Sequence, residues 1–326
     1  MYDNLSFKLP TEGLHKRTLE GFEQSLQYLN TSYRTEENQT RYYQSRKYKY
    51  SVSFTDRYIR FYKFSAPTFL YGTNEIQFQF GEIYQVISKL IDETKLPIDQ
   101  AEVTRIDVAG NLEVEKPPTE YFEVLGKNSR FKMRLPYPNS LNYQQKSNRR
   151  RLIFYDKLAE RIDKGYQLVN PENKTLRYEM KLIKSPHKAL KTPPMKFIDL
   201  TSKSHQTALL KLWKKEYEMI NKVGEAESLS NVKIHTPKDL FDYAAFLQLN
   251  NQNTLDHTYK QINNWKESGT ISQKFIENFN NKLKELQYKY RPTLTDRKSS
   301  KVEELNSLVM KQFGLLMGDA NSEPFF

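Results

Sequence analysis

The spacing of apolar residues predicts strands in the first part of the chain. Leu5, Phe7 and Leu9 alternate with polar residues, as in a strand with one buried face. Aromatic residues with a period of two predict a strand pair at 47–55 and 57–66. The same reasoning predicts strands at 103–115, 130–135, 141–157 and 175–184, and the segment 141–157 is expected to fold as a hairpin that turns near 147–148.

Helical spacing replaces this alternation in one early segment and throughout the last third of the chain. Apolar residues three and four positions apart predict a helix within 80–94, and Pro117 opens a shorter one. Segment 185–194 contains three prolines and predicts a linker without regular structure. After it, helices are predicted around 209–220, 237–247, 275–286 and 305–316, with Trp213 and Tyr217 in the core.

These elements predict an α+β fold in two parts. Residues 1–190 are expected to form an antiparallel-rich sheet domain with flanking helices. Residues 191–326 are expected to form an all-α region that could contact DNA, pack against the sheet domain or bind a partner, and a helix-turn-helix within 236–265 is one form that a DNA contact could take.

The charge balance points to a polyanionic partner. The chain has 51 Lys and Arg against 39 Asp and Glu, a formal net charge of +12, which favours DNA, RNA or an anionic membrane surface. There is no cysteine, which excludes disulfides, thiolate metal sites and a cysteine nucleophile. No Gly-x-x-x-x-Gly-Lys loop is present to suggest an ATP-driven motor. Without a signal-peptide pattern or a run of about 18 apolar residues, a soluble intracellular protein is expected.

Polar side chains occupy one face of three predicted strands. Arg105 and Asp107 share a face of the first strand. In the second strand Arg151, Ile153, Tyr155 and Lys157 share a face, and in the third Arg177, Glu179 and Lys181 do so. If the three strands belong to one sheet, these side chains line one surface.

This set of residues suits phosphodiester chemistry. A tyrosine hydroxyl needs a base, a metal or nearby positive charge to attack phosphorus. Asp107 and Glu179 are hard oxygen ligands suited to Mg²⁺ or Mn²⁺, and Lys157 could favour the phenolate or neutralise charge on phosphorus. Taken singly, a carboxylate in a strand is more often a solvated or salt-bridged surface group than a metal ligand, and a tyrosine is more often a packing residue than a nucleophile.

Four blocks within residues 60–185 resemble the gene II replication-initiator family of filamentous phages and its plasmid and phage relatives. These blocks are 69–74 (Phe-Leu-Tyr-Gly-Thr-Asn), 103–109 (Val-Thr-Arg-Ile-Asp-Val-Ala), 151–157 (Arg-Leu-Ile-Phe-Tyr-Asp-Lys) followed by Glu160, and 176–179 (Leu-Arg-Tyr-Glu). Their order and spacing carry the resemblance. Many strand-cutting initiators bind metal through a His-x-His motif, and none occurs among the five histidines of this chain.

The resemblance implies an enzyme that starts rolling-circle replication. Such an enzyme nicks one strand of the double-stranded origin, holds the 5′ phosphate on a tyrosine, and later rejoins the displaced single strand. It implies Tyr155 as nucleophile, Asp107 and Glu179 as ligands of Mg²⁺ or Mn²⁺, and Lys157 as supporting cation. Host helicase and polymerase are the implied partners, in the cytoplasm of a bacterial host and away from membranes.

Several alternatives stay open at this stage. Tyr143 is a second candidate nucleophile, because it could face the same site across a hairpin. The cations Lys146, Arg149, Arg150 and Arg151, with Arg105 and Arg177, are candidate DNA contacts, and the first four could equally form an exposed basic turn. A DNA-binding regulator without catalysis and a conjugative mobilisation relaxase are alternative functions.

Overall fold

The computed structural model of the protein describes residues 2–27, 33–35, 40–44, 50–74, 76–131, 133–165, 174–222, 235–250, 252–290 and 300–321. The strands are β1 (Tyr2–Pro10), β2 (Tyr33–Thr35), β3 (Thr40–Gln44), β4 (Ser51–Phe54), β5 (Tyr58–Ser65), β6 (Glu102–Glu113), β7 (Leu125–Asn128), β8 (Met133–Tyr137), β9 (Ser140–Gln144), β10 (Arg150–Asp156), β11 (Thr175–Leu182) and β12 (Ile220–Lys222). Ten of them form one antiparallel sheet in the order β2-β3-β4-β5-β1-β6-β11-β10-β9-β8, and β7 pairs with β12.

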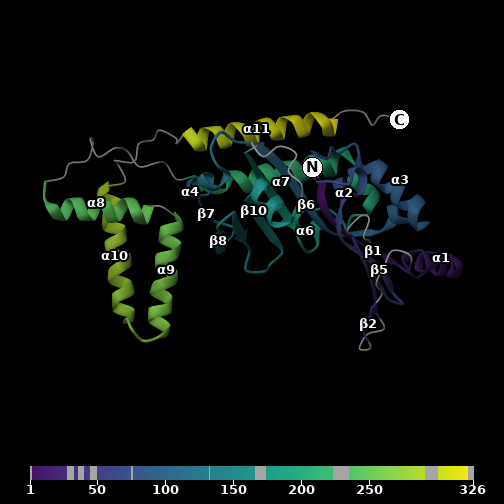
Figure 1. The fold of residues 1–326 in the computed structure, drawn as a ribbon, viewed down its shortest axis with the longest axis horizontal. Helices are drawn as coiled ribbons and strands as arrows, with labels where there is room; N and C mark the ends of the chain where they lie inside the picture. Colours follow the sequence, from purple (N-terminus) through teal and green to yellow (C-terminus); the bar gives the residue numbers. More distant parts are fainter. Residues whose placement is uncertain are drawn as a thin grey trace.

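Helices lie around this sheet and at both ends of the molecule. They are α1 (Lys16–Gln27), α2 (Ala66–Tyr71), α3 (Ile83–Thr94), α4 (Tyr121–Val124), α5 (Lys157–Asp163), α6 (Pro186–Leu190), α7 (Lys203–Glu218), α8 (Pro237–Asn250), α9 (Gln252–Glu267), α10 (Gln273–Tyr290) and α11 (Ser300–Asn321), with short 3₁₀ helices η1 (Ile98–Gln100), η2 (Pro118–Glu120) and η3 (Phe197–Thr201). Figure 1 shows α8, α9 and α10 gathered at one end and α1 at the other. The predicted α+β class is confirmed. In the described ranges, no helix combines the length and apolarity needed to cross a bilayer.

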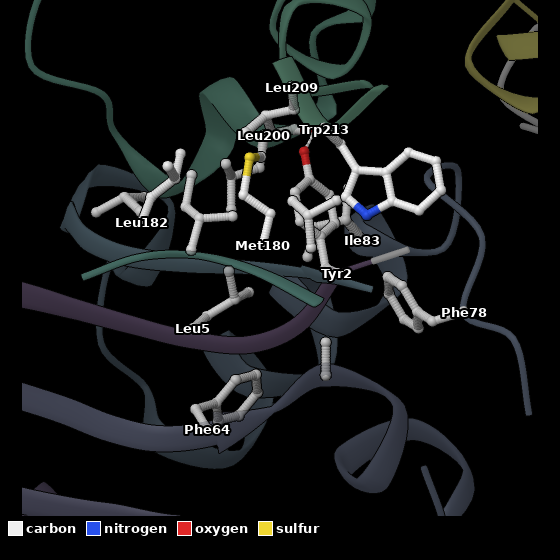
Figure 2. Close-up of a cluster of buried hydrophobic side chains, with 14 of the residues drawn as sticks. Tyr2, Leu5, Phe64, Phe78, Ile83, Met180, Leu182, Leu200, Leu209 and Trp213 are labelled. Carbon is white, nitrogen blue, oxygen red and sulfur yellow. Dashed lines mark hydrogen bonds between the residues drawn. The ribbon is translucent and has the colours of Figure 1, made fainter. Parts of the chain in front are cut away.

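The apolar face of the central strands packs against α7. Figure 2 shows Met180 and Leu182 of β11 reaching toward Leu200 and Leu209, close to Trp213. The Tyr178 hydroxyl also donates to the carbonyl of Trp213 at 3.0 Å, which fixes the helix against the strand.

Gly110 of β6 allows this close approach. A Cβ at Gly110 would lie 3.0 Å from the Trp213 ring, closer than ordinary van der Waals contact, so a larger residue would require the side chains of Trp213 and Gln312 to shift. The prediction that Trp213 and Tyr217 are core residues is confirmed, because they are 0% and 1% exposed.

Helices after residue 190 contribute to two separate hydrophobic clusters. Leu209 of α7 and Leu305 and Val309 of α11 belong to the same core as the sheet. Tyr243 of α8 and Tyr290 of α10 belong to a separate small cluster. The predicted division near residue 190 stays a prediction, as does the helix-turn-helix.

Three short helices were not predicted from the sequence. Ser65 ends β5 and its hydroxyl accepts a hydrogen bond from the Thr68 amide, so α2 begins directly after the strand, close to where the strand was predicted to end. Asp156 likewise caps α5, accepting from the amides of Leu158 and Ala159. The prediction of an irregular linker at 185–194 is wrong, because Pro186 opens α6, and proline is well tolerated in the first turn of a helix.

Candidate functional site on the polar face of the sheet

The polar side chains predicted on three strands do lie on neighbouring strands. The order β6-β11-β10 is contiguous in the sheet. Lys181 pairs in register with Asp107, Glu179 with Ile153, and Arg177 with Tyr155. Because paired residues in an antiparallel sheet point to the same side, these side chains share the face opposite α7.

An ion-pair cluster occupies the centre of this face. Arg177 lies 2.9 Å from Asp3 and 3.2 Å from Glu179. Lys181 continues the cluster, 2.9 Å from Glu179 and 3.8 Å from Asp107. Since Asp107, Arg177 and Glu179 are all buried, each of these charges depends on its partners.

Tyr155 lies at the edge of this cluster, where the face is hollowed. Its hydroxyl donates to Glu179 Oε1 at 2.7 Å. Both residues line a hollow of about 500 Å³, together with Asn4 of β1, Thr68 of α2, and Ser140 of β9. Tyr155 is thus the tyrosine of this face that is open to a ligand and in contact with a carboxylate.

In the site without substrate, the local electrostatics keep the Tyr155 hydroxyl protonated. Burial and the Glu179 carboxylate raise the pKa of Tyr155 well above its ordinary value, against the opposing effect of Arg177. Although burial acts in the other direction, Lys181 and Arg177 hold the pKa of Glu179 below its ordinary value. The hydrogen bond therefore joins a neutral phenol to an ionised carboxylate.

Lys157 reaches the site from α5. The prediction that it shares a strand face with Tyr155 is wrong, because β10 ends at Asp156 and Lys157 begins the helix. Its ammonium lies 2.7 Å from Glu160 and 3.3 Å from the Asn74 side-chain oxygen. It also lies 5.9 Å from the centre of the Tyr155 ring. Burial and Arg177 lower the pKa of Lys157 despite Glu160.

The predicted metal ligands are engaged by cations. Arg105 donates to both oxygens of Asp107, at 2.8 and 2.6 Å. Lys181 holds the position between Asp107 and Glu179 that a bridging divalent ion would need. Among the described residues, no group of three or more His, Asp or Glu side chains is placed to hold a metal ion. As arranged in the structure, Asp107 and Glu179 do not fit Mg²⁺ or Mn²⁺. Their assignment as metal ligands stays a prediction.

Tyr143 does not reach this hollow. It pairs in register with Leu152, on the apolar face, and is 0% exposed. Its hydroxyl lies 2.9 and 2.7 Å from the carbonyl oxygens of Leu125 and Gly126. A tyrosine held in this way is a packing residue, so the hypothesis that it faces the Tyr155 site is wrong.

The predicted basic cluster is divided between the two faces of the sheet. Arg150 points toward α7, where it lies 2.8 Å from the fully buried Glu216. Arg151 lies on the Tyr155 face, and its Nε has no hydrogen-bond partner in the described structure. Lys146 and Arg149 are exposed in the turn of the hairpin. Arg150, like the buried Arg177, serves an internal ion pair, while Lys146, Arg149 and Arg151 stay predicted DNA contacts.

Asp3 is a member of the site that the sequence did not indicate. Simple alternation along β1 would place it with Leu5 and Phe7 on the apolar side. A register shift between Tyr2 and Leu5 turns it to the polar face instead. Burial raises the pKa of Asp3 to about 6, although Arg177 acts to lower it.

This pKa predicts a pH-dependent effect of Asp3→Asn. Between about pH 4 and pH 6 the folded protein binds a proton that the unfolded chain has released, so wild-type stability falls as pH rises. Relative to wild type, the free energy of unfolding of the variant should rise by about 2 kcal/mol from pH 4 to pH 7. Urea unfolding at both pH values measures this. A relative loss over the same interval would show that Asp3 is ionised in the folded protein.

One comparison with known proteins bears on this site. Residues 68–194 match the family model that describes the N-terminal region of the phage replication-associated protein of the gene II type. The match spans β6, β10 and β11, the strands that carry Asp107, Tyr155 and Glu179. No curated protein matches the chain. The resemblance to the gene II type of replication-associated protein is confirmed over this segment.

Proposed function

We propose, from the match of residues 68–194 to the gene II type of replication-associated protein, that this protein initiates rolling-circle replication by nicking one DNA strand through Tyr155. The observation that carries the proposal is the hydrogen bond from Tyr155 to Glu179 at the mouth of a polar hollow. The hollow would hold the scissile phosphate, and the family match supplies the DNA substrate.

In the proposed step, the Tyr155 oxygen attacks phosphorus in line with the bond to the 3′ oxygen. The bond from Tyr155 to phosphorus forms and the bond from phosphorus to the 3′ oxygen breaks. The phenolic proton passes to Glu179, which already accepts it at 2.7 Å. The leaving 3′ oxygen takes a proton from Lys157, whose lowered pKa makes it a better acid than an ordinary lysine.

The pKa values at rest bear on the timing of this transfer. Because the proton is held on Tyr155 before reaction, it would leave only as the bond to phosphorus forms and the phenol becomes acidic. Arg177 and Lys181 would offset the charge developing around phosphorus. One phosphodiester replaces another, so no ATP is consumed, and the later reversal on a second strand rejoins the DNA.

The test is covalent adduct formation by the full-length protein. Labelled single-stranded oligonucleotides that tile the presumed origin are incubated with the protein, with Mg²⁺, with Mn²⁺ and with EDTA, and run on a denaturing gel. A shifted, protease-sensitive band supports the nickase. Binding in a native gel without an adduct in any condition would instead favour a DNA-binding regulator without catalysis.

A further inference from the structure

A second and larger hollow runs along the edge of the sheet. Strand β8 ends the sheet order, and beside it a hollow of about 1770 Å³ opens between β8, the β7–β12 pair and α9. Its lining includes the exposed lysines Lys127 and Lys260, the half-exposed Tyr137, and the exposed amides of Asn263 and Asn264. This combination of cations, an aromatic ring and amides is separate from the Tyr155 hollow.

The charge in this hollow is positive because its carboxylates are already paired. Asp256 lies 2.9 Å from Arg134, and Glu218 lies 3.5 Å from Lys214. By contrast, no carboxylate of the described residues lies within ion-pair distance of the lining residues Lys127, Lys222 and Lys260.

Lys222 is the most enclosed of these three lysines. Its ammonium lies 2.9 Å from the carbonyl oxygens of Tyr217 and Ile220. Burial lowers its pKa to about 8, despite Glu218. An anion at this position would supply the missing counter-charge.

The register of the sheet connects this hollow to Tyr155. Tyr137 of β8 pairs with Ser140 of β9, and Ser140 pairs with Tyr155 of β10. The three residues therefore lie in one row, with Tyr137 about 10 Å from Tyr155, two strand spacings away. The other walls of the second hollow, β7 and α9, lie on the opposite side of the sheet, where the Tyr143 hydroxyl contacts β7, so the two hollows meet at the edge strand β8. Tyr137 lines the second hollow and Ser140 lines the first, so the β8–β9 hairpin is their shared border.

We propose that the hollow along β8 binds the single-stranded DNA that flanks the scissile phosphate, with a base stacked on Tyr137 and phosphates held by Lys127, Lys222 and Lys260. The placement next to the scissile phosphate rests on the proposed function, while binding of single-stranded DNA does not. Tyr137 is 52% exposed on an edge strand, as a stacking platform must be. An acidic peptide would use the lysines, and its backbone could use the amides, but its carboxylate side chains would not stack on the ring.

The test measures binding of a labelled single-stranded oligodeoxythymidine to the full-length protein, in EDTA and in the Tyr155→Phe background. Tyr137→Ala is expected to weaken binding about tenfold, the loss typical of one base stacked on an aromatic ring. The double variant Lys127→Gln/Lys260→Gln is expected to reduce the slope of log affinity against log salt by about 1.4, which corresponds to two phosphate contacts.

Matched controls separate this site from general charge and exposure. Tyr288→Ala removes a tyrosine that is 90% exposed on α10, and Lys238→Gln/Lys274→Gln removes two exposed lysines, all of them outside the lining of both hollows. The controls should leave affinity and slope unchanged. Equal changes in affinity and slope in the control and hollow variants would overturn the proposal. Displacement of the oligonucleotide by polyglutamate with equal potency in wild type and in Tyr137→Ala would also overturn it.

The two proposals fail independently. If the wild-type protein forms the adduct, but the hollow variants bind single-stranded DNA as tightly as the protein without those substitutions, the β8 site is refuted and the nickase proposal stands. Loss of binding in the hollow variants, together with no adduct from wild type, would refute the nickase and leave the β8 site standing.

Discussion

Tyr155→Phe is expected to form no covalent DNA adduct while still binding single-stranded DNA. The substitution removes only the hydroxyl that lies 2.7 Å from Glu179 and keeps the ring in β10. With no oxygen to attack phosphorus, adduct formation should fall by about 10³-fold or more. The measurement is the denaturing gel for the adduct, with a native gel for binding on the same samples.

Tyr143→Phe is the matched control for this experiment. It removes a hydroxyl from the adjacent strand, on the opposite face of the sheet, where the hydroxyl contacts the carbonyl oxygens of Leu125 and Gly126 and the side chain of Arg134. We expect a loss of about 1 kcal/mol in the free energy of unfolding and a normal rate of adduct formation. Adduct that persists in Tyr155→Phe, or that disappears in folded Tyr143→Phe, would show that the nucleophile has been assigned wrongly.

Much of the site could be predicted because strand alternation fixes the face of a side chain. Asp107, Tyr155 and Glu179 each stood among polar residues with a period of two, and antiparallel pairing brought their strands together. The same rule explains why a basic run in the sequence is no cluster in space. Arg150 and Arg151 are neighbours in the chain, yet they point to opposite faces, one toward Glu216 and the other toward the open side.

Other features depend on local geometry that alternation cannot reveal. Asp3 enters the site through a bulge, which shifts the register by one residue and exchanges the faces. Lys157 changes position because the Asp156 side chain caps a helix at the end of the strand. Gly110 allows Trp213 of α7 to approach β6 closely, and the amphipathic pattern of a helix does not identify the surface that it packs against.

Glu179→Gln is expected to slow adduct formation about 10²-fold or more, because it removes the group that accepts the phenolic proton. The glutamine keeps the size of the side chain but leaves Arg177 and Lys181 with one less carboxylate in a buried cluster. The free energy of unfolding should therefore also fall, by about 3 kcal/mol. Adduct rates are compared under conditions where urea unfolding shows both proteins to be folded.

A second buried glutamate separates the chemical effect from the loss of stability. Glu216 is fully buried and pairs with Arg130 and Arg150 at 3.3 and 2.8 Å, on the other side of the sheet. Glu216→Gln should lose a similar amount of unfolding free energy, because it also leaves two arginines without an ionised carboxylate partner. It should nevertheless form adduct at the wild-type rate. If folded Glu179→Gln matched that rate, Glu179 would be a structural partner of Arg177 and Lys181, and the proton of Tyr155 would have to leave by another route.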